Sequence, residues 1–137
     1  ACNKMQGQVT SGANCIGQRA VITALKAPAS SVQYMVDEFQ VRRKLILDLI
    51  REIDGFKANE PEGAFYVFPD VSAYFGKTIK GKTINNASDM SLFLLEEALV
   101  ATVTGEAFGN PNCIRISYAA SQDNIKEAIK RIKEALS

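Results

Sequence analysis

Four segments of the chain repeat apolar residues every three or four positions, the spacing that gathers them on one face of a helix. These segments span residues 12–26, 31–53, 88–98 and 122–136. The last is the most regular, and its apolar face consists of Ile125, Ala128, Ile129, Ile132 and Leu136. We therefore expect four helices, of which the segment at 31–53 is the longest.

Residues at the ends of these segments support the assignment. Gly55 follows the long helix, where a glycine commonly ends one. Ser121 precedes the last helix, where a serine side chain can accept a hydrogen bond from the first turn. Within that helix Glu127 and Arg131 lie four residues apart, so we expect them to pair on its exposed face.

Three shorter runs predict strands. Residues 64–68 are continuously apolar and are followed by Pro69, and residues 99–103 are rich in β-branched side chains. Residues 113–118 alternate strictly, which places Ile114, Ile116 and Tyr118 on one side of a strand. Cys113, Arg115 and Ser117 are expected on the other side.

The order of these elements predicts an α/β chain, more closely an α+β unit of two layers, because helices alternate with a small sheet. Two polar stretches, 76–86 and 104–112, are expected to be loops. A short connector at 27–31 contains Pro28 and separates the first helix from the rest. We expect the first helix to belong to a different domain from residues 27–137.

Composition narrows the functional classes. The chain has 137 residues, of which 47% are hydrophobic and 23% charged, and its net charge is +1. This balance indicates a globular domain. With a net charge near zero, the chain has no overall positive potential that would attract nucleic acid or an anionic membrane. No apolar stretch approaches the ~20 residues that span a bilayer. The chain begins at Ala1 without Met or a signal sequence, so we expect a processed chain or a piece of a longer one.

The chain contains no histidine, which excludes a Ser-His-Asp triad, a Cys-His nucleophile and a Cys/His zinc site within it. The three cysteines, Cys2, Cys15 and Cys113, are odd in number and irregularly spaced. They do not form a disulfide framework, and we expect incidental thiols in a reducing cytoplasm.

One segment of the chain matches the residue pattern of a nucleotide-binding motif. Residues 76–83, GKTIKGKT, match the Walker A pattern, in which backbone amides and a lysine bind phosphates. A true phosphate-binding loop lies directly between a strand and a helix, and neither adjoins this segment in our assignment. We interpret the match as chance and keep a nucleotide-binding module as the alternative function.

Arg115 is the clearest candidate for binding a ligand. A guanidinium on a largely buried strand is costly unless an anion pairs with it. The partner is either an acidic side chain of this chain or a ligand carboxylate, which arginine grips through two parallel hydrogen bonds. The residues leave both alternatives open. Tyr66 and Tyr118 are weaker candidates for acid–base groups, because tyrosines are more often part of a core.

Three motifs together resemble a known family. Residues 61–70, PEGAFYVFPD, are similar to the P-x-G-A-F-Y-x-F-P-D segment of class I aminotransferases, closest to the bacterial type of aspartate aminotransferase. Residues 105–109, GEAFG, followed by 113–119, CIRISYA, resemble the ending of the same enzymes. Residues 4–11, KMQGQVTS, resemble the stretch that follows their cofactor-binding region.

The resemblance implies that this chain is the C-terminal part of an aminotransferase dependent on pyridoxal 5'-phosphate. Residues 1–26 would then end the large cofactor domain. Residues 27–137 would form the small C-terminal domain, including the bridging helix 31–53, which closes over the substrate. Arg115 would bind the α-carboxylate of amino-acid and 2-oxo-acid substrates, and the parent would be a cytoplasmic homodimer. Thr10 and Ser11 would approach the neighbouring subunit's cofactor phosphate.

One departure from the family decides what this segment can do alone. The family's S-K-x-F…G-x-R stretch, whose lysine carries the cofactor, is absent, as is the acidic residue that pairs with the cofactor ring. The resemblance therefore implies that the isolated chain is inactive, holds no cofactor covalently and contains no catalytic residue. It favours aspartate as the substrate and leaves alanine, aromatic amino acids and kynurenine open.

Overall fold

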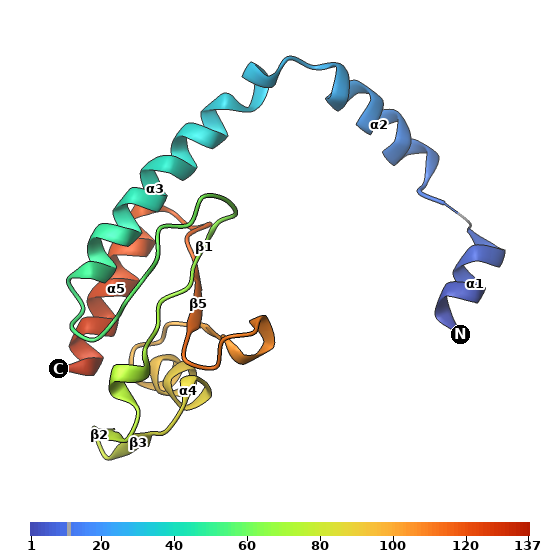
Figure 1. Cartoon of the computed structure of the whole chain (residues 1–137). Coiled ribbons are helices and arrows are strands. Elements are labelled where there is room, and N and C mark those ends of the chain that lie inside the picture. Colours follow the sequence, from blue (N-terminus) through green and yellow to red (C-terminus); the bar gives the residue numbers. More distant parts are fainter. Residues whose placement is uncertain (11) are drawn as a thin grey trace. The chain divides into compact units, whose positions relative to one another are not determined.

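The structure, a computed structural model, describes residues 1–10 and 12–137 (Figure 1). They form two compact units, Ala1–Val36 and Asp37–Ser137. The boundary lies inside the long helix α3 (Gln33–Arg51), so the connector at 27–31 belongs to the first unit. The assignment of residues 1–26 to a larger domain stays a prediction.

The first unit contains the helices α1 (Cys2–Val9) and α2 (Cys15–Lys26) and the 3-10 turn η1 (Ala29–Val32). Helix α2 confirms the segment predicted at 12–26, although it begins three residues later. It begins there because the Asn14 side chain accepts a hydrogen bond from the Gly17 amide at 2.7 Å. Helix α1 was not predicted, because its eight residues are too few for a repeating pattern.

The helices of the first unit carry uncovered apolar surface. No residue of α1 or α2 is buried. The side chains of Val9, Ile16 and Leu25 are 79%, 81% and 82% exposed. Large apolar side chains left this exposed in two successive helices are typical of a surface against which further protein packs.

The second unit is built around an antiparallel sheet of three strands in the order β1 (Tyr66–Val67), β5 (Ile114–Ser117) and β4 (Val103–Thr104). Tyr66 lies opposite Ser117, and Val103 lies opposite Arg115. The mixed helix and sheet architecture confirms the predicted α+β class.

Three helices accompany this sheet. Helix α4 (Ala87–Glu97) precedes β4, and α5 (Gln122–Leu136) ends the chain. Helices α3 and α5 run side by side in the same direction (Figure 1). The Gln122 amide donates to Glu38 at 3.4 Å near their N-terminal ends, and Lys133 pairs with Glu52 near their C-terminal ends.

A single core unites these elements. Most of its large, fully buried side chains come from α3, α4, α5 and the inner face of the sheet. They include Ile46, Ile50, Val67, Met90, Phe93, Leu94, Ile114, Ile129 and Ile132. The last helix behaves as predicted: the Ser121 hydroxyl accepts from the Asn124 amide at 3.2 Å, and Arg131 pairs with Glu127 at 2.8 Å.

The predicted strands needed correction in length. The run at 64–68 is a strand only at Tyr66–Val67, with Ala64 in a left-handed conformation at φ 60°. The strand predicted at 99–103 is wrong in place, because Leu99 adopts φ 55° at the end of α4 and the strand is Val103–Thr104. The β-branched residues at 99–103 suggested a strand, but they gave no sign that the chain there first leaves the end of α4.

The loop predicted at 76–86 is also wrong. It contains a two-stranded hairpin, β2 (Lys77–Ile79) and β3 (Lys82–Ile84). The two turn residues, Lys80 and Gly81, have φ values of 49° and 77°, as a tight hairpin turn requires.

Candidate functional site

The outer face of the sheet carries the candidate site. Strand alternation places Val67, Ile114 and Ile116 on the buried face, and all three are at most 6% exposed. Tyr66, Arg115, Ser117 and Val103 lie on the opposite face and are half-buried or exposed. The predicted alternation is confirmed over residues 114–118, and Arg115 points away from the core. The prediction is wrong at Cys113, which was expected on the outer face and is only 4% exposed.

The Arg115 guanidinium contacts two aromatic rings, those of Tyr66 and Phe108, which together we call the aromatic clamp. Its central carbon is 4.4 Å from the centre of the Tyr66 ring and 4.3 Å from that of Phe108. These contacts are cation–π interactions, which stabilise a cation partly removed from water.

Arg115 differs from the other arginines of the second unit. Each of those pairs with a carboxylate: Arg42 with Glu38, Arg43 and Arg51 with Glu60, and Arg131 with Glu127. Among residues 1–10 and 12–137, no carboxylate forms an ion pair with Arg115. Of the two alternatives left open by the sequence, the described structure therefore gives no support to an internal ion pair.

A tight loop presents the Phe108 ring to Arg115. The 3-10 turn η3 (Glu106–Phe108) lies between Gly105 and Gly109, and the Gly105 amide donates to the Cys113 carbonyl at 2.7 Å. A side chain at Gly105 would place its Cβ 2.4 Å from the Asn110 carbonyl oxygen. This close approach requires glycine and fixes the loop over the outer face of β5.

The aromatic clamp was not predicted from the sequence. Strand position indicates that Tyr66 and Arg115 share a face only once β1 and β5 are paired with Tyr66 opposite Ser117. The GEAFG motif drew attention to the loop, but its glycines do not show where Phe108 points. The sequence therefore identified the cation and missed the rings that hold it.

The other polar candidates have structural explanations. The Tyr118 hydroxyl donates to the Ala64 carbonyl at 3.0 Å, and burial raises the pKa of this phenol. Burial, with a smaller effect of the Asp70 carboxylate, raises the pKa of the Cys113 thiol, which disfavours a reactive thiolate. The Thr10 hydroxyl donates to the Gln6 carbonyl at 3.1 Å, and Ser11 lies outside the described residues.

The Walker-like segment has the wrong geometry for phosphates. Residues 76–83 form the β2–β3 hairpin rather than a loop between a strand and a helix. The Lys82 ammonium, which would have to reach a phosphate, contacts Glu96 and Glu97 at 2.6 Å each. This arrangement gives no support to the alternative of a nucleotide-binding module.

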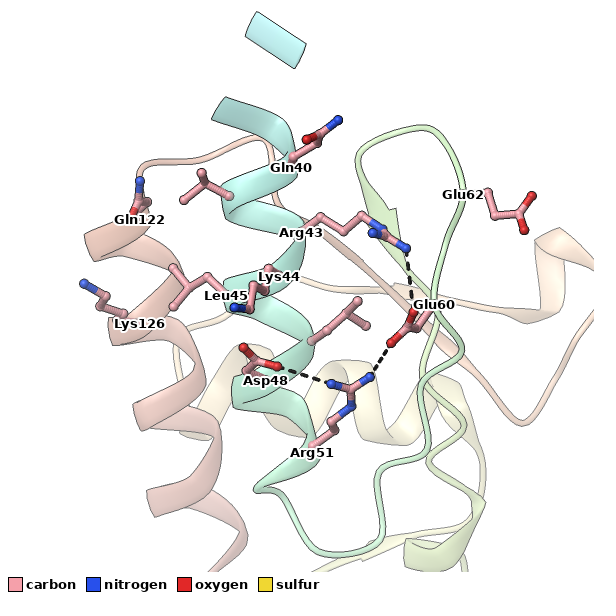
Figure 2. A pocket seen from close by; sticks show the side chains of 12 residues that line it. Gln40, Arg43, Lys44, Leu45, Asp48, Arg51, Glu60, Glu62, Gln122 and Lys126 are labelled. Carbon is pink, nitrogen blue, oxygen red and sulfur yellow. Dashed lines mark hydrogen bonds and ion pairs between the residues drawn. The ribbon is translucent and has the colours of Figure 1, made fainter. Parts of the chain in front are cut away.

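A separate hollow of about 1090 Å³ lies along α3 and is shown in Figure 2. Its charged side chains largely neutralise one another. Arg51 contacts Asp48 at 3.2 Å and Glu60 at 2.5 Å, and Arg43 lies 3.9 Å from Glu60. The hollow does not include Arg115, and its arginines already have partners.

The lysines of the chain lie at its surface or in ion pairs. Every lysine of the chain is exposed or half-buried, and the two half-buried ones, Lys82 and Lys133, pair with glutamates. Across the part of the chain that the structure describes, no group of three Cys, Asp or Glu side chains could hold a metal ion. None of the helices described there has both the length and the hydropathy of a transmembrane helix.

Comparison with known proteins gives the family. The family model for class I and II aminotransferases matches residues 1–132 of this chain. A bifunctional aspartate aminotransferase and glutamate/aspartate-prephenate aminotransferase of Petunia hybrida is 47% identical over 99% of this chain and 29% of its own length. The aspartate aminotransferase of Streptomyces avermitilis is 39% identical over 100% of this chain and 34% of its own.

Solved structures agree with this result. The aspartate aminotransferase of Rhizobium meliloti matches with a TM-score of 0.89 and 41% identity, over 96% of this chain and 33% of that one. That of Thermus thermophilus, solved with maleate, matches with a TM-score of 0.82 and 31% identity, over 97% and 33%. This chain belongs to the class I and II aminotransferase family, as its motifs predicted, and spans about a third of the length of these relatives.

Proposed function

We propose that this chain is the C-terminal part of a pyridoxal-phosphate-dependent aspartate aminotransferase and supplies the residue that binds the substrate's α-carboxylate, Arg115. The family, and relatives whose names include aspartate aminotransferase, support the reaction class. The single observation that carries the role of Arg115 is its guanidinium on the outer face of the sheet, held by two rings and without a carboxylate partner among the described residues.

The chemistry of the substrate fits this cation. Every amino acid and 2-oxo acid carries a planar carboxylate beside the reacting carbon. Arginine binds such a group through two parallel, charge-assisted hydrogen bonds, which fix both its position and its plane. Gripping the α-carboxylate orients the bonds at the neighbouring carbon and reduces the freedom lost in reaching the transition state.

Aspartate is the preferred substrate in this proposal, because the names of the relatives reported above include aspartate. The Thermus thermophilus relative was solved with maleate, which is a dicarboxylate like aspartate. The Petunia hybrida relative also has prephenate in its name, so a ring-bearing partner is the second substrate to test. Alanine, aromatic amino acids and kynurenine are the alternative amino donors with which aspartate is to be compared.

The whole protein uses pyridoxal phosphate as its electron sink in this proposal, and no lysine of this chain attaches it. The protein is a cytoplasmic homodimer, and residues 27–137 form the domain that closes over the substrate. Residues 1–26, with their uncovered apolar helices, form the end of the large cofactor domain.

The test is a substrate survey of the whole protein that contains this chain. Purified protein is supplied with pyridoxal phosphate and 2-oxoglutarate, and amino transfer is measured from aspartate, alanine, phenylalanine and kynurenine. Transfer from aspartate and from glutamate to prephenate is measured separately. The proposal predicts the highest kcat/KM with aspartate. An absence of amino transfer from every donor would refute the proposed reaction, and a clear preference for another donor would refute the specificity.

A further inference from the structure

The two rings that enclose Arg115 come from separate parts of the second unit. Tyr66 lies on β1, and Phe108 ends the turn η3 in the loop before β5. Register explains the first contact: Tyr66 lies opposite Ser117, two residues beyond Arg115, so Tyr66 and Arg115 are diagonal neighbours on one face. The second contact depends on the tight loop that begins at Gly105.

The arrangement restricts how the guanidinium can meet a ligand. A guanidinium is planar and directs all of its N–H groups outward in that plane. Its central carbon lies over the Tyr66 ring at 4.4 Å and over the Phe108 ring at 4.3 Å, so both rings limit the orientations that the guanidinium can adopt. A carboxylate that binds through two parallel bonds must approach along an edge of the guanidinium plane.

The exposure of the two clamp residues indicates that their rings contribute more to holding Arg115 than to packing in the hydrophobic core. The Phe108 ring is 49% exposed and Tyr66 is half-buried, so neither belongs to the buried core of the unit. Phe108 is nevertheless held in place, because Phe68 meets it edge to face at 6.5 Å. A half-exposed ring that contacts a cation for which the described residues supply no carboxylate partner indicates a role in orienting that cation.

We propose that Tyr66 and Phe108 are positioning residues that set the plane of the Arg115 guanidinium before its carboxylate ligand arrives. A preoriented arginine loses less side-chain freedom on binding, so more of the hydrogen-bond energy contributes to affinity and to orientation of the substrate. This proposal rests on the proposed function and extends it to the residues that act through Arg115.

The kinetic test uses the whole protein with aspartate as donor. Phe108→Leu and Tyr66→Leu should each lower kcat/KM by about five- to tenfold, mainly through KM, because each removes one cation–π contact. Phe108→Tyr and Tyr66→Phe keep the rings and should stay near the wild-type value. Leu95→Ala is the matched control, since Leu95 has the same 49% exposure as Phe108 but lies on α4.

A second measurement separates positioning from a general loss of structure. In the 137-residue chain, ring currents from both rings should displace the NMR signal of the Arg115 Nε–H from the usual arginine position. Phe108→Leu should return it toward that position while the free energy of unfolding in urea stays close to that of Leu95→Ala. An unchanged signal in Phe108→Leu, or loss of activity in proportion to lost stability, would overturn the proposal.

Arg115→Lys distinguishes failure of this proposal from failure of the proposed function. If Arg115→Lys lowers kcat/KM strongly and the leucine variants of the clamp do not, the clamp has no positioning role and the proposed function stands. If Arg115→Lys itself leaves kcat/KM unchanged, Arg115 does not bind the substrate, and both proposals fail.

Discussion

Gly105 is the residue at which the loop over Arg115 approaches itself most closely. A Cβ there would lie 2.4 Å from the Asn110 carbonyl oxygen and 2.5 Å from that of Cys113. Both obstacles are backbone atoms, which cannot move aside as a flexible side chain can. We therefore predict that Gly105→Ala lowers the free energy of unfolding by about 1–3 kcal/mol, the usual cost of overpacking.

Urea denaturation followed by circular dichroism measures this effect. Gly63→Ala is the matched control, because no atom lies within 4 Å of a Cβ built at Gly63. Equal stability of the two variants would show that the loop can open to admit a methyl group at no cost, contrary to the geometry.

The sequence identified the central cation of the site but not its surroundings. Strict alternation from Cys113 to Tyr118 was enough to place Arg115 on the outer face, because period two is a property of any strand. The position of Phe108 depends on a turn closed by Gly109 at φ 85° and on the hydrogen bond between Gly105 and Cys113. Neither leaves a periodic signal in the chain.

At the level of elements, strong periodicity was a better guide than composition. The amphipathic last helix was placed correctly because its apolar face repeats over four turns. The hairpin β2–β3 was read as a loop because polar threonines and lysines fill both of its short strands. Its turn uses Lys80-Gly81, a pair without the Asn-Gly or Asp-Gly signature that marks most tight hairpins.

The contact between this hairpin and α4 predicts a dependence of stability on pH. Hydrogen bonds to Glu96 and Glu97 raise the pKa of Lys82, and its hydrogen bond lowers the pKa of Glu97. A lowered carboxyl pKa stabilises the fold above its unfolded value of 4.5, and this contribution is lost as the pH falls through the folded pKa. A raised ammonium pKa contributes below 10.5, and this contribution is lost as the pH rises through the folded pKa.

Lys82→Met should therefore destabilise the chain at pH 7, and the difference from wild type should shrink below about pH 4.5. The effect is expected to be small, since ion pairs near the surface are screened by water and salt. Urea unfolding at pH 7 and pH 3 gives the comparison, with Lys57→Met as a control at an exposed lysine. A difference that stays constant across this range would contradict the ion-pair explanation.

At the scale of the whole molecule, the first unit predicts association. Ile16 and Leu25 are more than 80% exposed, and no residue of α1 or α2 is buried. Such surfaces drive association in water. Light scattering of the 137-residue chain should show oligomers and binding of a hydrophobic dye, both reduced in the double variant Ile16→Gln, Leu25→Gln. A monomer at high concentration without dye binding would show that the exposed apolar side chains of α1 and α2 do not drive association.

The lysines of the chain predict how it behaves toward pyridoxal phosphate. None is buried, and the half-buried Lys82 and Lys133 pair with glutamates. Borohydride reduction of the isolated chain with pyridoxal phosphate should therefore give weak labelling spread over several lysines, read by mass spectrometry. Stoichiometric labelling at one lysine would contradict our view that the chain contains no attachment site.

Substitution of Arg115 tests the central claim most directly. In the whole protein, Arg115→Lys keeps the charge but loses the planar pair of donors, which should lower kcat/KM for every amino-acid substrate by about a hundredfold if ~3 kcal/mol of charge-assisted bonding is lost. Arg131→Lys, at a surface ion pair, is the control and should have little effect. The free energy of unfolding should change little in Arg115→Lys, because the described chain contains no carboxylate partner for Arg115. It should also change little in Arg131→Lys, because the pair with Glu127 is exposed to water and lysine keeps the charge. Near-normal kcat/KM in Arg115→Lys, or loss of activity through unfolding alone, would contradict the account.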